Sequence, residues 1–236
     1  MRHMRALASE AEYRAQCGEF VCDGEKTLNE ALAAGAEICR ILWRDGAERN
    51  GVPSAEQYTA PDDLVEYASP LKAGHGPVFT VKMPDEAAGE IRNAIVLENV
   101  QDPGNVGTVI RGANAFGIGA VIMTGECADL YNPKTVRATM GAIFRQRVIR
   151  ADMAEMLEIL KANNLKLYGA ALSDRAQDIR KFDLSRCAVA VGSEGRGLSR
   201  ELLLACDGEI IIPMRPEAES LNAAVAASII MWEMSR

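Results

Sequence analysis

Residues 189–214, VAVGSEGRGLSRELLLACDGEIIIPM, decide the fold class of this chain. An apolar run, typical of a strand that is buried on both faces, leads into a turn that contains Gly192, Gly195 and Gly197. A helix-like segment and a second apolar run follow. This order is typical of a parallel sheet, in which ligands bind beyond the carboxyl ends of the strands. Glu194 lies between the glycines, where backbone crowding is low, so it can face a ligand. The plain alternative is a turn that is glycine-rich for steric reasons alone.

Strand-like and helix-like segments alternate on both sides of this stretch. The sequence predicts strands at 94–97, 120–123, 146–149, 166–171, 187–191 and 209–212. It predicts helices at 106–116, 133–143, 153–163 and 199–205, and a last helix from 221 onward. Short apolar strands that alternate with amphipathic helices predict an α/β fold with a mostly parallel sheet covered on both faces.

A polar stretch at 83–92, MPDEAAGEIR, predicts a boundary between two domains, at 1–84 and 92–236. The first domain has helix-like segments at 5–16, 25–34 and from Pro61 to 67, and strand-like segments at 19–22, 38–43 and 77–81, with a loop at 45–57. We therefore expect a small α/β unit, and no group of catalytic residues is visible in it.

The composition limits the classes of function. A net charge of −7 over 236 residues argues against binding of nucleic acid by the whole surface, but a few well-placed cations suffice for a local site. The stretch 130–150 contains no acid and carries Lys134, Arg137, Arg145 and Arg147. Alone it would be a solvated helix face. Beside the motifs described below, we interpret it as a surface that faces RNA.

Metal binding and membrane insertion are not expected. The six cysteines form no C-x-x-C pair, and the two histidines do not complete a zinc site. No apolar run is long enough to cross a membrane, and the N-terminus lacks the apolar core of a secretory signal. We therefore expect a cytoplasmic protein.

A second informative stretch is LENVQDPGNVGTVIRGANAFG, at 97–117. A strand ends in a polar turn, and Asn105 has the side chain of a good N-cap for the helix that follows. Arg111 lies early in that helix, where a positive charge gains nothing from the helix dipole. A structural ion pair with a neighbouring carboxylate is the plain alternative to a functional role.

A third stretch, ESLNAAVAASIIMWEM, begins at 219. Ser220 and Asn222 flank the start of an alanine-rich helix. The free backbone amides at such a helix start either bind a ligand carboxylate or are capped by a side chain. Considered alone, this stretch favours capping.

The three stretches together carry a family resemblance. The order DPGNVG-x-x-x-R, then VGSEGRGLS with IIIPM, then SLNAAVA resembles the TrmH/SpoU branch of the SPOUT methyltransferases. The resemblance runs from about 93 to the C-terminus. The part before about 84, which includes EFVCDGEKTLNEAL, is similar to the small substrate-binding domain that often precedes this fold and resembles RNA-binding ribosomal proteins.

The resemblance implies an RNA ribose 2′-O-methyltransferase that uses S-adenosylmethionine, with a deep C-terminal trefoil knot and a homodimeric state. It implies that Gly192, Ile212 and Leu221 contact S-adenosylmethionine and that Pro213 and Met214 form a wall of its pocket. It assigns catalysis or RNA positioning to the matching residues Asn105, Arg111, Glu194, Ser220 and Asn222. The leading domain favours ribosomal RNA over transfer RNA as the substrate.

The resemblance also assigns the role of general base to Arg111, which is chemically demanding. A guanidinium has a pKa above ~12 and so releases its proton poorly. We therefore expect Arg111 to orient a phosphate or the ribose, with relay of the proton as a second role. Two alternatives to the whole interpretation are an RNA-binding protein that has lost methyl transfer, and a nucleotide-binding enzyme such as a dehydrogenase, whose glycine fingerprint this chain lacks.

Overall fold

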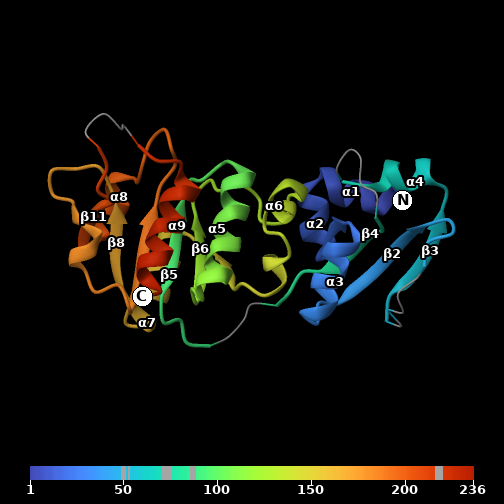
Figure 1. The fold of residues 1–236 in the computed structure, drawn as a ribbon, viewed down its shortest axis with the longest axis horizontal. Helices are drawn as coiled ribbons and strands as arrows, with labels where there is room; N and C mark the ends of the chain where they lie inside the picture. The colour runs from blue at the N-terminus through green and yellow to red at the C-terminus, as the bar shows by residue number, and fades with distance from the viewer. Residues whose placement is uncertain (49–51, 53, 71–75, 86–88, 216–219) are drawn as a thin grey trace. The chain divides into compact units, whose positions relative to one another are not determined.

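The computed structural model describes residues 1–48, 52, 54–70, 76–85, 89–215 and 220–236 (Figure 1). The chain folds into two compact units. The first comprises Met1–Glu86 and Asp129–Arg145, and the second comprises Ala87–Ala128 and Gln146–Arg236. No helix among these described residues is long and apolar enough to span a bilayer.

The first unit is built on a four-stranded sheet in the order β1-β4-β2-β3. Strand β4 runs antiparallel to β1 and β2, whereas β2 and β3 are parallel. Phe20 and Cys22 point into one core and Val21 into the other, as the two-residue period of a strand requires. The strands are β1 (Glu19–Asp23), β2 (Ile38–Arg44), β3 (Glu56–Ala60) and β4 (Val78–Lys82); the helices are α1 (Arg2–Ser9), α2 (Ala11–Cys17), α3 (Glu25–Ala33) and α4 (Asp62–Ala68).

Two local expectations for this unit are wrong. The single helix expected at 5–16 is two helices, because Glu10 between them adopts an extended backbone. The loop expected at 45–57 reaches into β3, which pairs with β2 along the edge of the sheet. Most side chains of β3 are exposed or half-buried, so the strand lacks the apolar run that would have revealed it.

The segment Asp129–Arg145 completes the first unit. Phe20 of β1 packs against Tyr131 and Phe144, with ring centroids 4.7 and 6.2 Å apart. Val136 and Ile143 are buried in the same core as Phe20. This segment lies in the range expected for the second domain, but its apolar side chains are buried in the first unit.

Polar contacts fix the same segment at both of its ends. Arg14, only 4% exposed, forms an ion pair with Asp129, and Arg145 pairs with Glu30 at 2.7 Å. The helix expected at 133–143 is interrupted, because Met140 and Gly141 have φ of 50° and 89°. It consists of α6 (Pro133–Ala138) and a short 3-10 helix (Ala142–Phe144).

The second unit is built on a seven-stranded sheet in the order β7-β6-β5-β10-β8-β11-β9. Every recorded pairing between these strands is parallel, which confirms the predicted mostly parallel sheet. The strands are β5 (Ala94–Glu98), β6 (Ala120–Thr124), β7 (Val148–Arg150), β8 (Lys166–Ala170), β9 (Gln177–Asp178), β10 (Cys187–Val191) and β11 (Gly208–Ile211).

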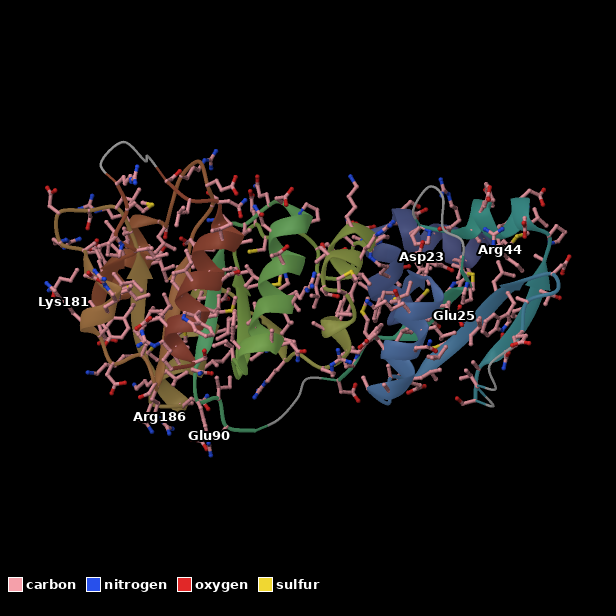
Figure 2. All side chains as sticks on the ribbon, in the orientation of Figure 1. Asp23, Glu25, Arg44, Glu90, Lys181 and Arg186 are labelled. Atoms are coloured by element: carbon pink, nitrogen blue, oxygen red, sulfur yellow. The ribbon has the colours of Figure 1, made fainter. Side chains whose placement is uncertain are left out.

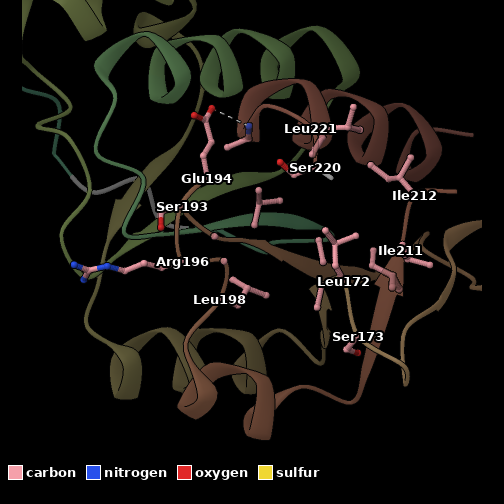
Figure 3. Close-up of a pocket in the computed structure, with 18 of the residues that line it drawn as sticks. Leu172, Ser173, Ser193, Glu194, Arg196, Leu198, Ile211, Ile212, Ser220 and Leu221 are labelled. Carbon is pink, nitrogen blue, oxygen red and sulfur yellow. Dashed lines mark hydrogen bonds between the residues drawn. The ribbon is translucent and has the colours of Figure 1, made fainter. Parts of the chain in front are cut away.

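Helices cover both faces of this sheet (Figures 1 and 3). On one face α5 (Pro103–Phe116) and α9 (Ala223–Met234) lie side by side, and a Cβ at Gly112 would come within 2.7 Å of Met231. On the other face α7 (Met153–Ala162) and α8 (Arg200–Ala205) pack their apolar side chains against the central strands. The close approach of α5 and α9 brings two of the conspicuous sequence stretches together.

Candidate active site

The start of α5 differs from the expectation. The helix begins at Pro103, and its N-cap is Asp102, whose Oδ1 accepts a hydrogen bond from the backbone N–H of Asn105 at 2.7 Å. Proline suits the first helical position because its missing N–H would have no partner there. Asn105 is therefore not the cap, and its side chain is available for other contacts.

Asn105, Glu194 and Asn222 form one hydrogen-bonded network. Oε1 of Glu194 accepts hydrogen bonds from Nδ2 of Asn105 at 3.0 Å and from Nδ2 of Asn222 at 2.5 Å. It also accepts one from the backbone N–H of Ala223 at 3.3 Å (Figure 3). Nδ2 of Asn222 lies 3.0 Å from Oδ1 of Asn105, which closes the triangle.

The network joins the three sequence stretches at the amino-terminal end of α9. Asn222 is the N-cap of this helix, since its Oδ1 accepts from the backbone N–H groups of Ala224 and Val225. A carboxylate at a helix N-terminus is stabilised by the helix dipole. Among the described residues, nothing donates a hydrogen bond to Oε2 of Glu194. That oxygen is the free acceptor of the network.

A cavity of about 400 Å³ lies beside this network. It opens at the carboxyl ends of β8, β10 and β11, where a parallel sheet binds ligands. Most of its walls are apolar side chains (Figure 3). The lining residues include Ala171, Leu172, Ser173, Val191, Gly192, Ser193, Glu194, Arg196, Leu198, Ile211, Ile212, Met214, Ser220 and Leu221.

This cavity brings together most of the residues expected to bind a cofactor. Gly192, Ile212, Met214 and Leu221 line it, and so does Ser220. Pro213 is exposed and is not among the described lining residues.

The close packing of the loop backbone requires glycine at position 192. An added Cβ would lie 2.2 Å from the carbonyl carbon of Gly197, because the loop folds back on itself with a hydrogen bond from Gly197 N to Ser193 O at 2.8 Å. The loop that lines the cavity therefore keeps its shape only without a side chain at position 192.

Two buried carboxylates hold loops that line this cavity. Glu98, 3% exposed at the end of β5, accepts a hydrogen bond from the backbone N–H of Ser199 at 2.7 Å. Glu209, 8% exposed on β11, accepts from the hydroxyl of Ser173 and pairs with Arg175 at 2.7 Å. The wall around Ser173 was not predicted, although Ser173 follows a predicted parallel strand closely, where such sheets bind ligands.

A second cavity, of about 580 Å³, adjoins the first, since Ser193, Glu194, Arg196 and Ala223 line both. Its walls come from the chain after β5, from the chain after β6 and from the glycine-rich loop. The remaining described lining residues are Asn99, Val100, Gln101, Asp102, Asn105, Glu126 and Gly195. The exposed Arg196 thus lies where the two cavities meet.

Arg111 is not part of the network. Its side chain is exposed on α5, and among the residues that the structure describes it makes no hydrogen bond or ion pair. The structural ion pair that was its alternative is therefore not seen within those residues.

The basic residues expected to bind RNA are in different situations. Lys134 and Arg137 are exposed on α6, and their side chains have no partner within the described part of the chain. Arg145 is paired with Glu30, and Nη1 of Arg147 donates to the backbone oxygen of Gly89 at 2.9 Å. The first three belong to the first unit and Arg147 to the second.

Comparison with known proteins places these features in a family. The model of the SpoU rRNA Methylase family matches residues 92–232. A 23S rRNA (guanosine(2553)-2′-O)-methyltransferase of Bacillus subtilis, RlmP, is 32% identical over 228 residues, which cover 94% of this chain and 90% of the relative. A 23S rRNA (uridine(2479)-2′-O)-methyltransferase of Streptomyces viridochromogenes is 28% identical over 251 residues, with 98% and 88% covered.

A solved structure extends the likeness to the whole fold. The SpoU methyltransferase AviRb of Streptomyces viridochromogenes, in complex with the cofactor AdoMet, superposes with a TM-score of 0.89. It is 28% identical in sequence, and the match covers 100% of this chain and 96% of that one. The likeness therefore includes both units.

Proposed function

This chain belongs to the SpoU rRNA methylase family, and we propose that it methylates the 2′-hydroxyl of one ribose in ribosomal RNA. It is an RNA 2′-O-methyltransferase with S-adenosylmethionine as methyl donor, as the resemblance implied. The observation that carries the proposal is the Asn105–Glu194–Asn222 network, which lies where two cavities meet.

We propose the first cavity as the methyl-donor site. Its volume of about 400 Å³ suits a small cofactor, and its walls are apolar with a few polar groups, as in most cofactor sites. Leu198, Ile211 and Leu221 offer side chains against which an adenine ring would pack. Gly192 and Ile212 offer backbone groups to the donor, and Met214 would form part of one wall. Pro213 does not line the cavity itself and would act by holding its neighbours Ile212 and Met214 in place.

The bound donor supplies a methyl group on a sulfonium centre. The chain itself has to orient the ribose hydroxyl, accept its proton and exclude water. No histidine is among the described residues that line either cavity. Oε2 of Glu194 is the free acceptor at their junction. We assign to it the hydrogen bond from the 2′-hydroxyl and then its proton, which the hydroxyl would give up as its oxygen takes the methyl group, the sulfur keeping the electron pair of the broken carbon–sulfur bond.

The other predicted residues support this group. Asn105 and Asn222 hold the carboxylate of Glu194 through their amides, and Ser220 lines the donor cavity. We keep Arg111 as an orienter of a phosphate or of the ribose. Its side chain is exposed and has no partner among the described residues, so it is available to bind RNA.

We further propose that the protein is a homodimer, with the outer face of α9 as the interface. Val225, Ile229 and Trp232 are 48%, 38% and 58% exposed there, beside a surface cavity that Asn105 also lines. A surface of this kind favours contact with a second copy of the chain. Changing Ile229 to Asp should shift the mass in sedimentation from dimer to monomer. Changing Leu204, 71% exposed on α8, to Asp is the control and should not.

We also propose a role for the first unit, a cellular location and a knotted C-terminus. The first unit would bind RNA, since the similarity to the two 23S rRNA enzymes extends over nearly the whole chain. The cytoplasm would be the place of action. The sheet order, with β10 between β5 and β8, is compatible with a C-terminal trefoil knot.

The function is tested by mapping 2′-O-methyl groups in ribosomal RNA from cells with and without the gene. We expect one site to disappear without the gene and to return with the wild-type gene, but not with Glu194→Gln. An unchanged ribosomal map together with a lost site in transfer RNA would contradict the choice of ribosomal RNA. Calorimetry that detects no binding of S-adenosylmethionine would instead support the alternative of an inactive RNA-binding protein.

A further inference from the structure

The second cavity adjoins the proposed site of methyl transfer and is larger than the donor cavity. If Glu194 holds the ribose at the junction, the second cavity is an adjoining space that can take the base attached to that ribose. Enzymes that modify one nucleotide in RNA commonly take its base out of the stack and read its Watson–Crick edge. The family does not settle which base is read, since one relative acts on guanosine and the other on uridine.

One wall of this cavity is formed by a turn that includes Asn99 and Glu126. Asn99 adopts a φ of 56°, which is uncommon for a residue other than glycine. Its Oδ1 accepts a hydrogen bond from the backbone N–H of Glu126 at 2.8 Å. Gly125 has a φ of 66°, and an added Cβ there would lie 2.3 Å from the same oxygen. Asn99 and Gly125 together fix the backbone position from which Glu126 extends.

The side chain of Glu126 is held as well. Its Oε2 accepts a hydrogen bond from Nε2 of Gln101 at 3.3 Å. Among the described residues nothing donates to its Oε1, so the carboxylate keeps acceptor capacity for a ligand. Asp102 adds a second carboxylate, whose Oδ1 accepts from the N–H of Asn105 and whose Oδ2 has no donor within the described part of the chain. This wall therefore offers two carboxylate oxygens, Oε1 of Glu126 and Oδ2 of Asp102, that accept no hydrogen bond from a described residue.

The donor pattern of the bases selects one of them. Guanine presents two adjacent donors on its Watson–Crick edge, N1–H and the N2 amino group, which match the two oxygens of one carboxylate. Uracil presents a single N–H between two carbonyl oxygens, which a carboxylate repels, and adenine and cytosine each place an acceptor beside their amino group. A charge-assisted pair with two parallel hydrogen bonds is both strong and selective.

We propose that the second cavity binds the base of the target nucleotide, that this base is guanine, and that Glu126 reads its N1–H and N2 amino groups. The inference rests on the proposed function and deepens it. Gln101 and Asn99 act as positioning residues for Glu126, and the nucleotide phosphates lie on the side of Arg196.

The experiment uses the full chain and synthetic RNA fragments that span the mapped methylation site. Each fragment carries guanosine, inosine, adenosine or uridine at the target position, and transfer of tritiated methyl groups gives kcat/KM for each. Inosine lacks only the amino group of guanosine. We expect guanosine to be the best substrate and inosine to be about 10-fold poorer, the effect of one hydrogen bond to a charged group.

The variant Glu126→Gln tests the assignment itself. We expect kcat/KM on the guanosine fragment to fall about 10- to 100-fold and the preference over inosine to shrink towards 1. The affinity for S-adenosylmethionine should stay within about 2-fold, because Glu126 does not line the donor cavity. Glu90→Gln is the matched control. Glu90 is an exposed acid of the same unit, paired with Arg186 at 2.7 Å (Figure 2), and it lines neither cavity.

The outcomes distinguish failure of the guanine assignment from failure of the proposed function. Methylation that maps to a base other than guanine overturns this inference and leaves the proposed function intact. An unchanged ratio between guanosine and inosine in Glu126→Gln removes the role of Glu126. A wild-type protein that binds S-adenosylmethionine but transfers methyl groups to no ribosomal RNA contradicts the proposed function, and this inference with it.

Discussion

The side-chain amide of Asn222 donates a 2.5 Å hydrogen bond to the carboxylate of Glu194, which lies 28 residues earlier in the chain. The same asparagine caps α9 through its oxygen. The Asn222 side chain therefore both caps the last helix and holds the carboxylate of Glu194 at the junction of the two cavities. The start of α9 and the glycine-rich loop are consequently expected to respond together to substitution.

Glu194→Gln should remove the proton acceptor while keeping the hydrogen-bonded network. The glutamine keeps an oxygen for the amides of Asn105 and Asn222, so folding should be preserved, but it no longer accepts a proton. We expect kcat to fall about 100-fold or more, the usual contribution of a general base. Single-turnover methyl transfer measures the effect. Glu201→Gln, a change in the first turn of α8, should leave the rate unaltered. Near-normal turnover in Glu194→Gln would exclude it as the proton acceptor.

Gly192→Ala should deform the donor cavity. The added methyl group would lie 2.2 Å from the backbone of Gly197, so the loop has to move. We expect a loss of about 1–3 kcal/mol in the free energy of unfolding and a weaker affinity for S-adenosylmethionine. Denaturant titration and calorimetry measure the two effects. The control is Gly195→Ala, because a Cβ at Gly195 meets nothing within 4 Å. Equal affinities in the two variants would contradict the proposed donor site.

Arg111→Lys separates charge from shape. Lysine keeps the positive charge but lacks the planar fork that binds a phosphate or two oxygens at once. If Arg111 orients the ribose or a phosphate through this fork, kcat/KM should fall about 10- to 100-fold while the affinity for S-adenosylmethionine is unchanged. Arg92→Lys, another exposed arginine of the second unit, is the control. Near-normal turnover in Arg111→Lys would rule out any role that needs the fork.

The basic residues of 134–147 should differ in their effect on RNA binding. Lys134 and Arg137 have no side-chain partner among the described residues, whereas Arg145 already pairs with Glu30. We expect the double change of Lys134 and Arg137 to Ala to reduce the slope of log K against log salt by about 1–2, and Arg145→Ala or Arg147→Ala to reduce it less. Filter binding at several salt concentrations gives the slopes. Unchanged slopes in all variants would remove this surface from the RNA interface.

Stability at alkaline pH should depend on two thiols. Burial raises the pKa of Cys187 and of Cys206 from 9.0 to about 12. The folded protein therefore keeps both protons to a higher pH than the unfolded chain, so the contribution is complete below pH 9 and is lost as the pH rises towards 12. We expect the free energy of unfolding to fall across this window, and less steeply in Cys187→Ala and Cys206→Ala. Parallel curves for wild type and variants would contradict the raised pKa values.

The sequence predicted the second sheet well because its central strands are buried on both faces. The strand at 187–191 was predicted at its observed bounds, since a short apolar run that ends at a glycine-rich turn favours a buried strand over a helix. Strand β3 was missed because an exposed edge strand carries few apolar residues. Gln177–Asp178 pairs with β11 through only two residues and leaves no pattern at all.

The sequence pointed to several residues of the candidate site, but it did not predict how they are arranged. The motifs pointed to Asn105, Glu194 and Asn222, yet the wrong cap was assigned, because Asp102 and Asn105 are both good N-caps and only the position of Pro103 separates them. Ser173 and Glu126 follow strands directly, but nothing local distinguishes their loops from others. Their importance comes from the order of strands in the sheet, which sequence periodicity does not give.

The packing of Asp129–Arg145 into the first unit means that this unit is not one continuous piece of the gene. On a ribosome, Phe20 emerges long before Tyr131 and Phe144, so the core they share stays open until synthesis has passed the middle of the chain. A fragment that ends near residue 90 would expose that apolar surface and leave the buried Arg14 without Asp129. The leading half of this protein therefore depends on the later half to finish folding, and the two are expected to be inherited together rather than exchanged as modules.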